Sequence, residues 1–169
     1  QYASFGCKVA IDNGIVAIAG RLSYDQAIST GAVYLFHKDN NGSQQWEQLS
    51  KLVPTNASAN DYFGHDIDLD EGILLVSALY QGDGTVYMFA QNHGGVNHWG
   101  NAHTFVSPFP SMSREFGSSC AIDGMNVVVG ESLISSFSYF SGNAYHYTLQ
   151  QEELDSDGDG ICDAFDYCA

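Results

Sequence analysis

Residues Phe63 to Phe89 read FGHDIDLDEGILLVSALYQGDGTVYMF, and this stretch is the unit from which the chain is built. The same order of features occurs upstream, where Phe5 to Phe36 reads FGCKVAIDNGIVAIAGRLSYDQAISTGAVYLF. It occurs again downstream, where Phe116 to Tyr147 reads FGSSCAIDGMNVVVGESLISSFSYFSGNAYHY. Each copy has a Phe-Gly start, an apolar segment that ends in Asp and a turn, an aliphatic run, and a Gly followed by small and aromatic residues. The chain is therefore a repeat protein.

Each copy predicts the same succession of β-strands. In the first copy, residues 5–12 and 15–19 are rich in apolar and β-branched residues, and the turn sequence Asp12-Asn13-Gly14 between them is typical of a hairpin. A third strand is predicted at residues 31–36. A fourth, in which apolar and polar residues alternate, is predicted at residues 46–52.

The second copy keeps this order and has Trp99 at the repeat position of Trp46. The third copy predicts the strands FGSSCAID, NVVVG and NAYHYTL, with a long Ser-rich loop before the last, and has no Trp-led fourth strand. Four-stranded units of about 50 residues are typical of β-propeller blades. We therefore predict an all-β fold with about 11 strands, in three propeller-type blades of four, four and three strands; the repeats cover about residues 1–60, 61–113 and 114–149.

Several positions have a predicted role within the blades. The aliphatic second strands do not alternate, so we expect them to be buried on both faces, and the glycines that open the third strands indicate close approach or a bend. Asp12, Asp70 and Asp123 recur at one repeat position and are expected to cap backbone amides at hairpin turns. Asp66 and Asp68 share one face of a strand, for which an ordinary strand surface is favoured over a weak cation site.

The repeated pattern resembles a known family. The FG start, the V-A-I-D turn, the aliphatic strand and the G-A-V-Y-L-F strand followed by W-x-x-x-x-K-L are similar to FG-GAP repeats, the blades of integrin-α-type propellers. The resemblance covers about residues 1–149 and implies a propeller fold. The GAP triplet is replaced by Ala19-Gly20-Arg21, Ser77-Ala78-Leu79 and Gly130-Glu131-Ser132, and no following loop has the D-x-D-x-D-G cation site of some integrin blades. Calcium binding is therefore not expected in the blades.

Residues 150–169 form a separate tail that contains the motif DSDGDGICDAFDYC. Its spacing matches a calcium loop, with Gly160 at the sharp turn and the ligands supplied by Asp155, Asp157, Asp159, the backbone carbonyl of Ile161, Asp163 and Asp166. The cysteines within it make the tail resemble a thrombospondin type 3 repeat, whereas an EF-hand would need flanking helices that the sequence does not predict. We expect Ca²⁺ as the cofactor, and a solvated acidic tail is the alternative.

The overall charge limits the class of partner. Five Lys and Arg against 20 Asp and Glu give a net charge of -15, which repels nucleic acid and anionic membranes and suits divalent cations. No run of about 18 apolar residues is present, so we expect no membrane insertion.

Cysteines and sequons indicate an extracellular or cell-surface location. Four cysteines without a CxxC pair fit disulfides better than zinc, and Asn41 and Asn56 are candidate glycosylation sites. A bond between Cys162 and Cys168 is slightly favoured. The other pairings, which involve Cys7 and Cys120, stay open.

Three blades leave surfaces that need a partner. Propellers close with about four to eight blades, so the end blades each have an unmatched face. We expect an extracellular, calcium-stabilised structural or adhesive module that acts through protein contacts, as a self-associating ring or filament subunit or as part of a longer propeller protein. The alternative is a lectin-like propeller that binds glycans at loop aromatics such as Tyr80. Scattered histidines and the lack of a G-x-S-x-G elbow predict no enzyme.

Overall fold

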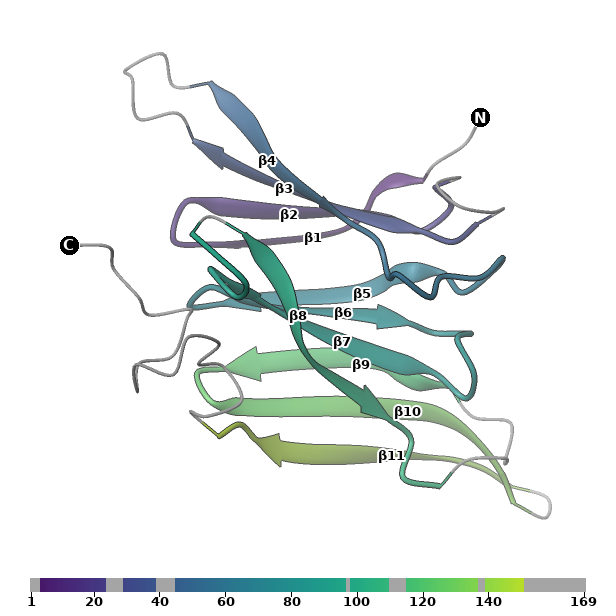
Figure 1. The fold of residues 1–169 in the computed structure, drawn as a ribbon. Coiled ribbons are helices and arrows are strands. Elements are labelled where there is room, and N and C mark those ends of the chain that lie inside the picture. Colours follow the sequence, from purple (N-terminus) through teal and green to yellow (C-terminus); the bar gives the residue numbers. More distant parts are fainter. Residues whose placement is uncertain are drawn as a thin grey trace.

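The computed structural model describes residues 4–23, 29–38, 45–96, 98–109, 115–136 and 139–150, and all regular structure in them is β-strand. Eleven strands form three separate antiparallel sheets (Figure 1). Within each sheet the strands lie in chain order, because every strand is joined to its neighbour by a short or medium connection. The predicted all-β fold with sheets of four, four and three strands is confirmed.

We call the three sheets blades 1, 2 and 3. Blade 1 contains β1 (Phe5–Asp12), β2 (Ile15–Gly20), β3 (Ala32–Lys38) and β4 (Trp46–Leu52). Blade 2 contains β5 (Phe63–Asp70), β6 (Ile73–Ala78), β7 (Thr85–Gln91) and β8 (Trp99–Val106). Blade 3 contains β9 (Phe116–Asp123), β10 (Asn126–Ser136) and β11 (Tyr139–Thr148).

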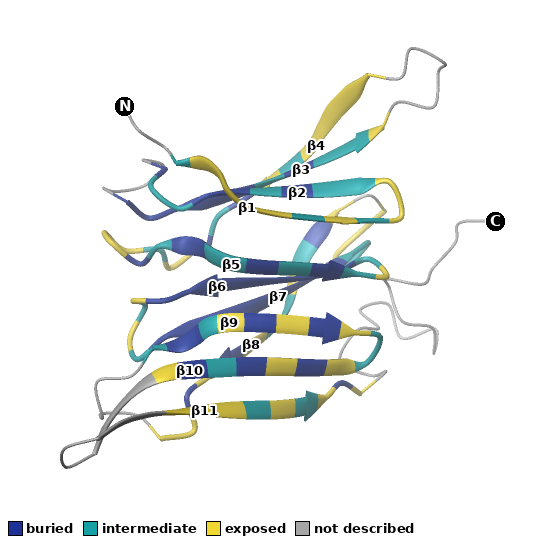
Figure 2. Ribbon diagram, turned by 180° about the vertical axis from the view of Figure 1, so that it is seen from behind, coloured by how far each residue is buried: buried dark blue, intermediate teal, exposed yellow. Residues whose placement is uncertain are grey.

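The blades stack face to face, with the first strand of each blade next to the first strand of the following blade. Figures 1 and 2 show β1, β5 and β9 side by side along one edge of the stack. The later strands of each blade lead away from this edge. This arrangement is that of neighbouring propeller blades.

Two apolar cores lie between the blades. The first core joins blades 1 and 2 and contains Leu74 and Val76 of β6. The second core joins blades 2 and 3 and contains Ile73 and Leu75 of the same strand. All six residues of β6 are buried, so the prediction that the aliphatic second strand is buried on both faces is confirmed for blade 2.

In blade 3 that prediction is wrong. Val127 and Val129 of β10 are buried in the second core, but Val128 between them is exposed. Adjacent residues of a strand point to opposite faces, and within the described residues no blade lies beyond blade 3. Figure 2 shows this as alternating buried and exposed positions along β10.

The expected Ser-rich loop of blade 3 is shorter in the structure than the sequence predicts. Strand β10 extends to Ser136 and β11 begins at Tyr139, with the backbone pairs Ile134 with Ser141 and Ser136 with Tyr139. A serine backbone pairs as well as any other, so the two strands of a hairpin can continue their ladder through polar residues, here after a register shift between Glu131 and Ile134.

Candidate interaction surface at the blade interfaces

Three aspartates of β5 hold blade 3 against blade 2. The Asp66 carboxylate accepts a hydrogen bond of 2.9 Å from the backbone N–H of Cys120. The Asp68 carboxylate accepts one of 2.8 Å from Ile122. At the end of the strand, Asp70 accepts one of 2.6 Å from Gly124. Because alternate residues of a strand share one face, the three carboxylates form a ladder along β9.

The ladder satisfies backbone groups that a sheet edge leaves unpaired. Strand β9 pairs only with β10 inside its own sheet, so alternate N–H groups on its other side point toward blade 2. Aspartate side chains reach them, and a carboxylate makes a charge-assisted hydrogen bond. The interpretation of Asp66 and Asp68 as an ordinary strand surface therefore missed their role.

The aspartate at the end of each first strand acts between blades. Asp12 accepts a hydrogen bond of 2.9 Å from the N–H of Glu71, as Asp70 does from Gly124. Both residues cap an amide at a hairpin turn, as predicted, but the turn belongs to the next blade. The sequence does show that these aspartates recur, but it does not show which turn they reach.

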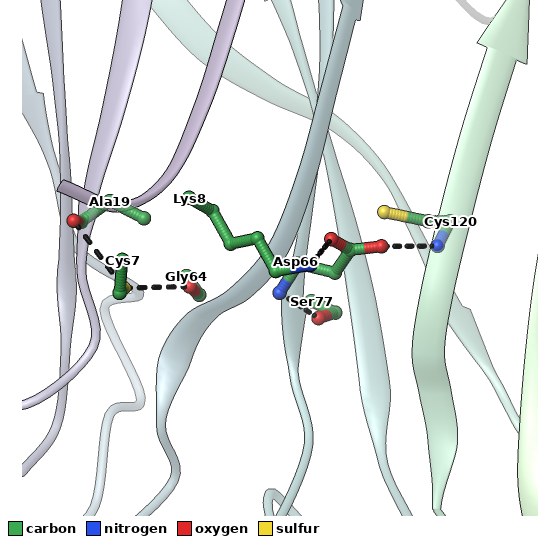
Figure 3. A network of polar contacts seen from close by, with 7 residues as sticks. All are labelled: Cys7, Lys8, Ala19, Gly64, Asp66, Ser77 and Cys120. Carbon is green, nitrogen blue, oxygen red and sulfur yellow. Dashed lines mark hydrogen bonds and ion pairs between the residues drawn. The ribbon is translucent and has the colours of Figure 1, made fainter.

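The interface between blades 1 and 2 uses a different set of residues. At the positions of Asp66 and Asp68, blade 1 has Lys8 and Ala10. The Lys8 ammonium lies 3.0 Å from the Asp66 carboxylate, which thus contacts both neighbouring blades (Figure 3). Of the three ladder positions, blade 1 thus keeps an aspartate only at Asp12, and an ion pair replaces one of the missing hydrogen bonds.

Glycines before the third strands allow the blades to approach each other. A Cβ atom on Gly31 would collide with the backbone carbonyl of Phe63, and one on Gly84 would collide with that of Phe116. The N–H of Phe63 donates to the carbonyl of Thr30 at 2.9 Å, next to this contact. The interpretation of these glycines as points of close approach is confirmed.

Blade 1 has an outward face that repeats the chemistry of the buried interfaces. We call four of its exposed apolar side chains, Phe5, Val9, Ile11 and Trp46, the β1 end face; their exposed fractions are 55%, 66%, 68% and 48%. Their repeat equivalents in blade 2 are Phe63, Ile67, Leu69 and Trp99, which belong to the first core with exposed fractions of 0%, 7%, 6% and 4%. The end face is thus a blade interface that no described residue covers.

The opposite end of the stack is the outward face of blade 3. We call five of its exposed side chains, Ser119, Ala121, Asp123, Val128 and Ala144, the β10 end face; the polar His146, which pairs with Val128, is exposed beside them. It has fewer large apolar groups than the β1 end face. The equivalents of Val128 are Ala17 and Leu75, both fully buried against the next blade.

A buried glutamate was not predicted from the sequence. Glu131 is fully buried and accepts hydrogen bonds from the hydroxyl groups of Ser107, at 3.0 Å, and Tyr145, at 2.7 Å. Such partners offset the cost of burying a carboxylate. Its repeat equivalents Gly20 and Ala78 are small, so the only sequence signal was the altered GAP triplet.

The two described cysteines are free thiols. Cys7 is exposed on β1 and Cys120 is buried on β9, with β5 between these strands, so no Cys7–Cys120 bond forms. Burial raises the pKa of the Cys120 thiol well above its usual value. The Cys7 thiol lies 3.5 Å from the carbonyl oxygen of Ala19.

His65 of β5 is a partly buried histidine near Arg21, Lys8 and Asp66. Partial burial and the nearby Arg21 lower its pKa below 6.5, and Lys8 acts in the same direction, while Asp66 and Glu115 oppose them. The Nδ1 atom of His65 is buried and has no hydrogen-bond partner among the described residues. Both observations favour the neutral imidazole.

Part of the predicted sites lies outside the described residues. These are the calcium ligands Asp155, Asp157, Asp159, Ile161, Asp163 and Asp166, the cysteines Cys162 and Cys168, and the sequon residue Asn41. Asn56 lies in an exposed turn, where its side-chain oxygen accepts a hydrogen bond of 2.9 Å from the Tyr87 hydroxyl.

Neither a metal-ligand cluster nor a membrane-spanning helix occurs in the described part of the chain. It holds no group of three or more His, Cys, Asp or Glu side chains suited to a metal ion. In the same residues, no helix has the length and hydrophobicity needed to span a bilayer.

The stacked antiparallel sheets, the Phe-Gly starts and the interblade aspartates define propeller-type blades. Residues 46–89 match the family model for the FG-GAP repeat, a stretch that runs from β4 to the middle of β7. It covers less than a third of the 169 residues. The match supports the FG-GAP resemblance, while the resemblance of the tail to a thrombospondin type 3 repeat stays a prediction. No match was found among curated proteins.

Proposed function

We propose that this chain is an extracellular or cell-surface structural or adhesive module, stabilised by calcium, that acts through protein–protein contacts. The main support is the β1 end face, where Phe5, Val9, Ile11 and Trp46 are exposed while their equivalents in blade 2 are buried. Within this function, the chain self-associates or joins further domains of the same polypeptide. We propose binding, and not catalysis, as its role.

The energetics favour a protein partner for this face. Full burial of one large aliphatic or aromatic side chain stabilises by about 1.5–3 kcal/mol, so covering four such groups is a strong driving force. Contiguous apolar patches of this kind mark interaction sites on soluble proteins. The FG-GAP match agrees with this role, since the repeat is typical of extracellular and surface proteins that bind other proteins.

The sequence of the tail is the reason that the proposal includes calcium. Acidic residues at alternate positions, with Gly160 at the turn, supply the hard oxygen ligands that Ca²⁺ prefers. The net charge of -15 also favours divalent cations over anionic partners.

Measurement of mass in solution tests the proposal. We expect assemblies in millimolar calcium that dissociate when a chelator is added. Sedimentation velocity measures the mass before and after the addition. Calcium binding itself is measured by titration calorimetry, with Asp157→Ala as the variant that should weaken it. A monomeric chain that binds no calcium would contradict the proposal.

A glycan-binding role is the second candidate. The exposed Tyr80 ring lies 5.3 Å from that of Tyr62, and such a loop aromatic offers a stacking surface for a sugar. A groove of about 320 Å³ between β4 and β8 is lined in part by Tyr87, Trp99 and Asn101. Retention of a monomeric chain on a glycan array, lost in Tyr80→Ala, would favour this role over the first.

A further inference from the structure

The two interfaces inside the chain define how one blade docks on the next. The preceding blade supplies an aspartate at the end of its first strand, Asp12 or Asp70. The following blade supplies the N–H at its first hairpin turn, from Glu71 or Gly124. It also inserts the apolar side chains of its first strand between the blades.

The β1 end face has all the features of a following blade. The repeat equivalent of Glu71 and Gly124 is Asn13. Gly6 has the same left-handed φ as Gly117, +85° against +82°, but a Cβ on Gly6 would meet no atom within 4 Å. At Gly117, the methyl group of Val86 in the preceding blade would lie 2.9 Å away. The space beside Gly6 is thus the space that a preceding blade occupies elsewhere.

The Phe5 side chain of this face already packs as its buried equivalent in blade 2 does. The Phe5 ring lies 5.4 Å from that of Tyr34. The equivalent pair in blade 2, Phe63 with Tyr87, is 5.6 Å apart in the first core. Because the exposed ring is held as the buried one is, docking needs little reorganisation at this position.

The β10 end face has the features of a preceding blade. Its first strand ends in Asp123, the equivalent of Asp12 and Asp70. Ser119 and Ala121 replace the other two ladder aspartates, but blade 1 has no ladder aspartate at these positions either and still docks on blade 2. Val128 and Ala144 are its apolar groups, and His146 pairs with Val128 at the repeat position of the buried Leu35 and Met88.

We propose that a second copy of this chain covers the β1 end face with the β10 end face of its blade 3. In this head-to-tail contact, the carboxylate of Asp123 accepts a hydrogen bond from the N–H of Asn13 in the next copy, and Val9 and Ile11 pack against Val128 and Ala144. The inference rests on the proposed function and names its partner. The outward side of blade 1 also carries Lys38 and Lys51, which pair with Trp46 and Tyr34, whereas the β10 end face carries Asp123. The two faces therefore have charges of opposite sign, which favours their approach in a chain of net charge -15.

A charge placed at either face tests the contact. Val9→Asp puts a carboxylate in the interface, and we expect about 100-fold weaker association, or more, because an unpaired charge would be buried. Val96→Asp is the matched control, because Val96 is as exposed as Val9, 69% against 66%, and lies outside both end faces. Both variants keep the fold, since each site is exposed in the single chain, and equal melting temperatures at low concentration check this.

Mixing two variants, each with one altered end face, distinguishes the head-to-tail contact from other modes of self-association. Val9→Asp keeps an intact β10 end face, and Val128→Asp keeps an intact β1 end face. Each should be monomeric alone, and an equimolar mixture should give heterodimers and no larger species by sedimentation velocity. The wild-type chain, with two intact faces, forms larger rings or filaments.

Three results would overturn the inference. Assembly of Val9→Asp alone at the wild-type affinity would show that another surface joins the copies, and the proposed self-association would stand. Failure of the mixture to form heterodimers would exclude the head-to-tail contact. A wild-type chain that stays monomeric at all concentrations would remove both the second-copy partner and the self-association in the proposed function.

Discussion

The carboxylate of Asp70 accepts a hydrogen bond of 2.6 Å from the backbone N–H of Gly124, a residue 54 positions later in the chain. This bond joins the end of the first strand in blade 2 to the hairpin turn of blade 3. Asp12 and Glu71 repeat the relationship one blade earlier. A carboxylate that reaches the next blade therefore occurs at both blade interfaces, and it explains why an aspartate closes β1 and β5.

Replacement of Asp70 should destabilise the fold, whereas replacement of Asp123 should not. Asp70→Ala leaves the N–H of Gly124 without its acceptor, and we expect a loss of about 1–2 kcal/mol in the free energy of unfolding. Asp123 has the same repeat position, but no described blade lies opposite it. Asp123→Ala should therefore change the free energy of unfolding by less than about 0.5 kcal/mol. Urea denaturation at a concentration where the chain is monomeric measures both. Equal losses would mean that the aspartate stabilises its own hairpin instead.

An alanine at Gly117 should cost more stability than an alanine at Gly6. Both positions have a left-handed φ, which costs an L-residue roughly 1–2 kcal/mol. At Gly117 the new methyl group also meets Val86 and Ser77 of blade 2, which adds about 1–3 kcal/mol of overpacking. Thermal unfolding of the two variants, compared with the wild-type chain, isolates the packing contribution. A similar melting temperature for both variants would argue against close blade contact at Gly117.

The two described cysteines should differ in reactivity. Cys7 is exposed, whereas Cys120 is buried and its thiol pKa is raised by that burial. Since the thiolate is the reactive form, iodoacetamide at pH 7.5 should modify Cys7 at least about tenfold faster in the folded chain. Peptide mapping by mass spectrometry separates these sites from the cysteines of the tail. Equal rates in denaturant provide the control, and equal rates in the folded chain would contradict the buried position of Cys120.

His65 should make stability depend on pH. The pKa of His65 in the folded chain is below the ordinary value of 6.5. Near and just below pH 6.5, the unfolded chain therefore binds more protons than the folded chain. The stability that neutral His65 contributes is therefore fully present above pH 6.5, and it is lost as the pH falls through 6.5 toward the pKa of His65 in the folded chain. The melting temperature of the wild-type chain should fall more steeply from pH 7.5 to pH 5.5 than that of His65→Gln. A slope for His65→Gln equal to that of the wild-type chain would contradict this assignment.

Much of the fold follows from the sequence because strands and turns have local causes. Hairpin turns at Asn13-Gly14 and Glu71-Gly72, together with apolar runs of strand length, predict where most strands begin and end. The recurrence of the pattern then predicts blades and their order. Where local signals were weak, in the serine-rich part of blade 3, the prediction of a long loop was wrong, and the ladder continues to Ser136.

The sequence alone thus determined the eleven strands, their grouping into blades, and the recurrence of Asp12, Asp70 and Asp123. Only the tertiary structure decided which amides these carboxylates reach, that Glu131 is buried, and that Ile11 is exposed while Leu69 at the same repeat position is buried. The reason is physical. Strand formation depends on near neighbours in the chain, whereas burial and interblade hydrogen bonding depend on whether another blade lies opposite, and equivalent residues in a repeat share the first property but not the second.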